Sequence, residues 1–110
     1  MQAISHATVA ERLARLAQVY EHGQASPLMD QTLEKLMTHE AEQSRAQLGE
    51  LETDLAELER RYGTKSEDFY ARFQAGQTDD RMDFVEWASL VQMAANMRQR
   101  LWLLTGMVAS

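Results

Sequence analysis

The 110-residue chain contains no cysteine, a single proline and five glycines. The lack of cysteine excludes a disulfide framework, a thiolate metal site and a cysteine nucleophile. The longest unbroken run of bulky apolar residues, 101–104, is far shorter than the roughly 20 residues that a membrane-spanning helix needs. The first residues show no basic stretch followed by an apolar run, so they do not resemble a signal peptide. We therefore expect a cytoplasmic protein that has no membrane partner.

Basic residues are also few, with 11 Lys and Arg against 17 Asp and Glu and a net charge of −6. Affinity for nucleic acids comes mainly from Lys and Arg that neutralise phosphates, so direct binding to DNA or RNA is disfavoured. Residues 26–63 hold nine acids and four bases, which gives −5 of the total −6. The negative charge therefore belongs to one segment, which forms either a solvated face or a surface that covers a basic partner.

The scarcity of glycine and proline makes the ends of helices easy to locate. Apolar residues at three- and four-residue steps predict a first helix over residues 8–22. Ser26 at the N-cap and Pro27 at the first helical position then open a second helix. No strong stop signal follows before Gly63, so this helix should be long.

The part of the sequence after the long helix predicts two more helices. Either Thr64 or Ser66 can cap a short helix that ends near Gly76. The pair Asp79-Asp80 can then cap a final helix over about residues 81–105. No stretch alternates apolar and polar residues with period two for long enough to indicate a strand.

These patterns predict an all-α fold made of helical hairpins with a long central coiled-coil helix. In chain order its parts are an N-terminal helix (1–25), a long acidic coiled-coil helix (26–63), and a short helix plus a long C-terminal helix (64–110). We expect them to form one structural domain, because a chain of this length fits a single compact fold.

A regular stripe of apolar residues follows the second half of the long helix. Its residues are spaced 3-4-3-4, like the a and d positions of a coiled coil, and are Leu48, Leu51, Leu55, Leu58 and Tyr62. We call this set the leucine seam. Leucines left in water lose the free energy of burial, so something must cover the seam. The cover is either a second copy of the chain or its own C-terminal helix, and we expect a homo-oligomer in the form of a dimeric helical bundle.

The C-terminal helix is apolar on more than one side. Its main apolar positions are Phe84, Trp87, Ala88, Val91, Ala94, Ala95, Leu101 and Trp102, and Met93, Met97 and Leu104 extend the stripe around the side. So wide a stripe is typical of a helix that contacts more than one neighbour.

Residues 54–104 resemble a known family in the order of their motifs. After a Glu/Leu heptad come Tyr62-Gly63, Ser66-Glu67-Asp68-Phe69, Phe73, Gly76, Asp79-Asp80, Asp83-Phe84 and Glu86-Trp87. The string is similar to small bacterial and archaeal proteins that act as antitoxins of toxin–antitoxin modules, encoded beside a ribonuclease-like toxin. The resemblance implies a non-enzymatic protein whose partner is a cognate toxin.

Two interpretations of these motif residues stay open. Trp and other aromatic residues dominate interface hot spots, so Phe84, Glu86, Trp87 and Trp102 are candidates for binding the partner. Alternatively the motif is a folded corner, in which Phe84 and Trp87 pack on the face formed by Phe69 and Phe73. A corner of this kind would serve any function.

Enzymatic interpretations have less support. Asp80, Asp83 and Glu86 share a helix face, as in half of the site of a Mg-dependent all-α nucleotide hydrolase, but no second acidic pair with matching spacing is evident. We therefore predict no catalytic residues, no metal and no cofactor. The main alternative to an antitoxin is a self-associating adaptor, and the hydrolase is the second alternative.

Overall fold

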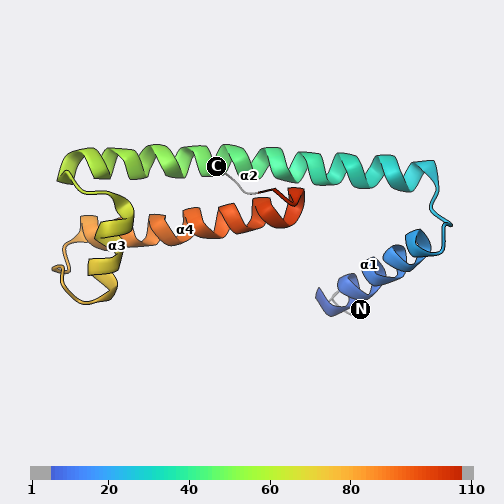
Figure 1. Cartoon of the computed structure of the whole chain (residues 1–110), viewed down its shortest axis with the longest axis horizontal. Coiled ribbons are helices and arrows are strands. Elements are labelled where there is room, and N and C mark those ends of the chain that lie inside the picture. Colours follow the sequence, from blue (N-terminus) through green and yellow to red (C-terminus); the bar gives the residue numbers. More distant parts are fainter. Residues whose placement is uncertain (1–5, 108–110) are drawn as a thin grey trace, which may run out of the picture. The chain divides into compact units, whose positions relative to one another are not determined.

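The computed structural model describes residues 6–107 and places them in four helices (Figure 1). These are α1 (His6–Glu21), α2 (Pro27–Tyr62), α3 (Ser66–Gln74) and α4 (Met82–Thr105). The all-α prediction is confirmed for this part of the chain, which contains no strand. None of the four helices is long and apolar enough to cross a membrane. The chain forms two compact units, residues 1–36 and 37–110, and α2 contributes to both.

The starts of α2 and α3 depend on different kinds of contact. As predicted, Ser26 caps α2, and its Oγ accepts a hydrogen bond from the Met29 amide at 3.3 Å. The prediction that Thr64 or Ser66 caps α3 is wrong. The Ser66 amide instead donates to Glu59 Oε2 at 2.8 Å, so a carboxylate at the end of α2 satisfies the first free N–H group of α3.

The start of α4 differs from the prediction by one position. The N-cap residue is Arg81, and its side chain makes no capping hydrogen bond. Asp79 Oδ1 accepts the Arg81 amide at 3.0 Å, so this carboxylate holds the turn before the helix. Gly106 ends α4 with φ 70°, the left-handed conformation that glycine adopts without steric cost.

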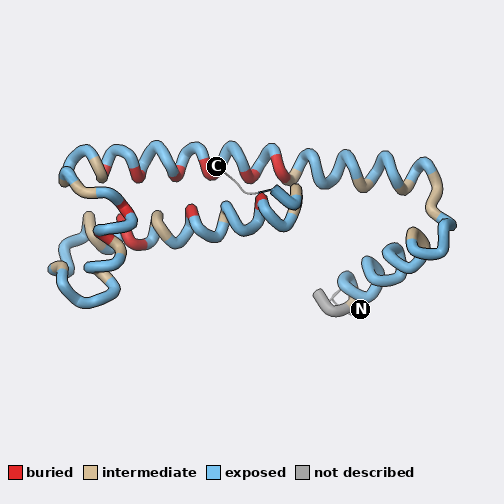
Figure 2. Tube along the Cα trace, in the orientation of Figure 1, coloured by how far each residue is buried: buried red, intermediate tan, exposed pale blue. Residues whose placement is uncertain are grey.

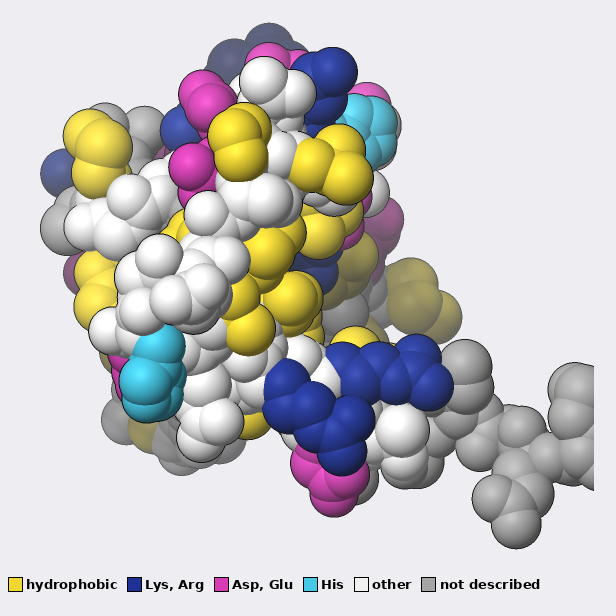
Figure 3. Space-filling view, turned by 90° about the vertical axis from the view of Figure 1, so that its right-hand side faces the viewer, with side chains coloured by type: hydrophobic (Ala, Val, Ile, Leu, Met, Phe, Trp, Pro, Cys, Tyr) yellow, Lys and Arg dark blue, Asp and Glu magenta, His cyan; other side chains and the backbone are white. Residues whose placement is uncertain are grey.

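The first unit contains α1 and the start of α2. Tyr20 Oη donates to Asp30 Oδ1 at 2.7 Å and so joins the end of α1 to the first turn of α2. None of residues 8–36 is buried. The apolar side chains Val9, Leu13, Leu16, Leu28 and Leu36 are 37% to 72% exposed. In the space-filling view of Figure 3, hydrophobic side chains lie at the surface among polar and charged ones.

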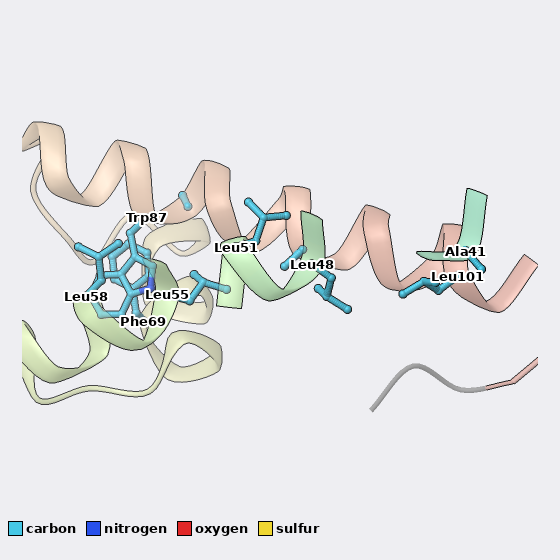
Figure 4. Packing of buried hydrophobic residues seen from close by; sticks show 10 residues of the cluster. Ala41, Leu48, Leu51, Leu55, Leu58, Phe69, Trp87 and Leu101 are labelled. Atoms are coloured by element: carbon cyan, nitrogen blue, oxygen red, sulfur yellow. The ribbon is translucent and has the colours of Figure 1, made fainter. Parts of the chain in front are cut away.

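The second unit is a hairpin of α2 and α4, with α3 packed against it at the closed end (Figure 1). Its buried apolar residues are Ala41, Leu48, Leu51, Leu55, Leu58, Phe69, Trp87, Ala88, Ala94 and Leu101. They lie on the facing sides of the helices (Figure 2), and Figure 4 shows the leucines of α2 pointing toward α4 and α3. The four leucines of the leucine seam are thus covered within the chain, and the cover is the chain's own C-terminal part. A second copy is not needed for their burial, so self-association stays a prediction that requires another surface.

Polar contacts fix the register of α2 against α4. Arg100 donates from Nε to Ser44 Oγ at 2.9 Å and from a terminal guanidinium nitrogen to Glu40 Oε1 at 2.7 Å. Arg98 lies 3.4 Å from Glu52. The side chain of Ser44 is buried, and Arg100 is the hydrogen-bond partner of its hydroxyl. These polar pairs form at only one alignment of the two helices, so they specify the register of an otherwise apolar contact.

Candidate interaction surfaces

The aromatic residues of the sequence motif form a packed corner between α2, α3 and α4. Trp87 stacks on Phe69 with ring centroids 3.9 Å apart and planes 3° apart. Its indole Nε1 donates to Ser66 Oγ at 3.0 Å, and the residue is 1% exposed. The Phe84 ring lies 5.4 Å from Phe69 and is half-buried. The structure therefore corrects the hypothesis that Trp87 stays exposed for a partner, because its whole side chain is used inside the corner.

Asp83 ties the start of α4 to the end of α2. Tyr62 Oη donates to Asp83 Oδ2 at 2.5 Å, and Arg61 donates to the same oxygen at 3.0 Å. The hydrogen bond from Tyr62, with that from Arg61, lowers the pKa of Asp83 from its ordinary value of 3.8. Asp83 thus makes a structural contact. Among residues 6–107 no group of three or more His, Asp or Glu side chains is arranged to hold a metal ion.

This contact predicts a pH dependence of stability. Because the folded-state pKa of Asp83 is lowered, the contact stabilises the fold at pH values above 3.8, and the stabilisation is lost as the pH falls through the lower folded-state value. In Asp83→Asn the carboxylate is absent at every pH. We expect the variant to be less stable than the wild type at neutral pH, and the difference to shrink below pH 3.8. Urea unfolding of both proteins as a function of pH measures it, and a difference that stays constant would contradict the assigned contact.

The acidic residues of α2 form an outward surface. Five of them in the second unit are exposed, Glu42, Glu50, Glu52, Asp54 and Glu57. Glu57 is paired with Arg60, and Glu52 with Arg98. The other three make no ion pair or hydrogen bond with any residue that the structure describes. Their charge is therefore available to a basic surface.

Exposed apolar residues gather at the end of α4. Trp102 is 53% exposed, Leu103 is 65% exposed and Met107, just past the helix, is 69% exposed. We call these three residues the C-terminal patch. The neighbouring Leu101 is buried against α2, so the helix that carries the patch is anchored on its other side.

The structure divides the four residues predicted to bind a partner into two pairs. Phe84 and Trp87 belong to the aromatic corner, whereas Glu86 and Trp102 are exposed. Sequence reasoning did not select Leu103 and Met107. The apolar run at 101–104 could have indicated them, because Leu103 lies in it and Met107 follows it. A run alone, however, does not show which of its residues are buried and which are exposed.

Comparison of the chain with protein-family models, with curated proteins and with solved structures finds no match.

Proposed function

We propose that this chain is a non-enzymatic protein-interaction module, an antitoxin that binds and neutralises a cognate ribonuclease-like toxin. The proposal draws its functional class from the family resemblance of residues 54–104. The observation that carries it is the C-terminal patch, where a tryptophan, a leucine and a methionine are exposed within six consecutive residues at the end of an anchored helix. Large apolar side chains exposed close together on a surface are typical of protein-binding sites, and tryptophan is enriched among binding hot spots.

The acidic surface of α2 supports the same kind of partner. An enzyme that acts on RNA needs positive charge to hold phosphates, so its substrate cleft is basic. The unpaired carboxylates of Glu42, Glu50 and Asp54 would attract such a cleft and raise the rate of association. Apolar burial at the C-terminal patch would then hold the complex. Binding should accordingly weaken as salt concentration rises, through a slower association rate.

Co-expression with the product of the adjacent gene tests the proposal. We expect the two proteins to copurify and growth inhibition by the neighbour to be relieved. Trp102→Ala removes the largest side chain of the C-terminal patch and should weaken the complex by about 30-fold or more, the effect of losing a hot spot of about 2 kcal/mol. Isothermal titration calorimetry with the purified proteins measures the change.

Met82→Ala is the matched control, because Met82 is also on α4 and is 77% exposed, but lies at the other end of the helix. It should leave the affinity within about twofold of the wild type, as expected for a residue outside the hot spot. Equal affinities of the two variants would contradict the C-terminal patch as the binding site. No complex with the neighbour, together with a stable homo-oligomer, would favour the self-associating adaptor.

A further inference from the structure

Two heptad stripes run side by side along α4. The first faces α2 and contains the buried residues Trp87, Ala94 and Leu101. The second is spaced 4-3-4-3-4 and consists of Glu86, Leu90, Met93, Met97, Arg100 and Leu104. We call this second set the α4 side stripe. In a coiled coil, residues with this spacing face a partner helix. The apolar members of the stripe are Leu90, Met93, Met97 and Leu104.

The α4 side stripe is partly open to solvent. Met93 is 48% exposed, and Leu90, Met97 and Leu104 are half-buried at the edge of the core. The short helix α3 contacts a different side of α4, where Gln92 Nε2 donates to Tyr70 Oη at 2.9 Å. Beside Met97 a groove of about 520 Å³ opens between α2 and α4. Its lining residues are His39, Glu40, Gln43, Ser44, Gln47, Met97 and Arg100.

The charges of the stripe are complementary to those of a second copy that runs antiparallel to it. Glu86 and Arg100 lie seven residues on either side of Met93, and Glu86 makes no hydrogen bond or ion pair within residues 6–107. Arg100 already pairs with Glu40 of α2, but its side chain is still 51% exposed and can contact a second carboxylate. If a second α4 packs antiparallel about an axis midway between Met93 and Met97, Glu86 lies about 6 Å along the helix axis from the partner copy's arginine, at 1.5 Å per residue. A parallel pair would instead set glutamate against glutamate and arginine against arginine, which is destabilising.

We propose that the α4 side stripe is a self-association surface on which a second copy of the chain docks antiparallel about a two-fold axis that crosses the stripe midway between Met93 and Met97. The contact joins two hairpins of α2 and α4 into a four-helix bundle with an isologous interface. It does not depend on the proposed antitoxin function. Trp102 and Leu104 point about 200° apart around α4, so the dimer leaves Trp102 of the C-terminal patch free for another protein.

Mass in solution tests the contact. The wild type should show twice the chain mass of 12.6 kDa in sedimentation equilibrium. Met93→Asp places a carboxylate in the middle of the stripe and should give a folded monomer, because Met93 is half-exposed and outside the core. Val85→Asp is the matched control: Val85 is 47% exposed and lies outside the α4 side stripe, about 80° around the helix from Met93, so its variant should remain dimeric. A monomeric wild type, or equal masses for both variants, would overturn the proposal.

Crosslinking tests the orientation, and the lack of cysteine in the chain makes single-cysteine variants unambiguous. In the antiparallel arrangement the two copies of position 93 are about 6 Å apart along the axis, and the two copies of position 86 about 27 Å apart. A short bismaleimide should therefore join Met93→Cys efficiently and leave Glu86→Cys unjoined. Equal crosslinking of the two variants would show a parallel pair, and no crosslink at position 93 would exclude the stripe as the interface.

Discussion

Replacing Trp87 with alanine is expected to lower the free energy of unfolding by about 3 to 5 kcal/mol, the range for removing a buried aromatic side chain. Trp87 is 1% exposed, stacks on Phe69 and is the donor to the buried Ser66 hydroxyl. The substitution therefore leaves a cavity and removes the hydrogen-bond donor for that hydroxyl. Urea unfolding followed by circular dichroism measures the loss.

The second tryptophan of α4 supplies the control. Trp102 is 53% exposed, so Trp102→Ala should change the free energy of unfolding by less than about 1 kcal/mol while it weakens binding to the partner. The two variants thus separate stability from recognition on one helix. Similar destabilisation by both would mean that the aromatic corner does not hold α4 in place.

An acidic residue in the leucine seam should be still more disruptive. Leu55 is 7% exposed and is part of the core between α2 and α4. Leu55→Asp removes buried apolar area and forces a carboxylate without a partner into the core, so we expect a loss of about 4 kcal/mol or more. The protein should then show little cooperative unfolding, and its exposed core should bind a hydrophobic dye.

Ala56→Asp is the matched control for this change, since the next residue of α2 is exposed and receives the same charge. An aspartate at this position faces water and costs mainly the lower helix propensity of Asp than of Ala, so the effect should stay within about 1 kcal/mol. If Leu55→Asp were tolerated as well as this control, Leu55 would be on the surface and the hairpin packing would be wrong.

The long helix could be predicted because its signals are local. Ser26 and Pro27 at the start and Gly63 just after the end act through the backbone of their own neighbours, and the structure places α2 between them. The cap of α3 could not be predicted in this way. It comes from Glu59 in a different helix, and the contact exists only once α2 and α3 have packed.

The candidate binding residues also combine a feature that the local sequence predicts with one that depends on packing between helices. The sequence places two tryptophans in the apolar stripe of α4. It does not indicate which of the two is buried. The difference arises from α3, which brings Phe69 against Trp87 and leaves Trp102 beyond its reach. Likewise the spacing of the leucine seam predicts that it is covered. The identity of the cover depends on the path of the chain after Gly76, which spacing within α2 does not encode.

Hydrogen–deuterium exchange of the chain with and without the neighbouring gene product tests the proposed recognition most directly. Protection should appear over the last turns of α4 and the residues that follow, about 99–107, because the C-terminal patch becomes buried in the complex. The aromatic corner should exchange equally slowly in both states, since it is already packed. Protection confined to α1, or no change anywhere in the chain, would contradict binding through the end of α4.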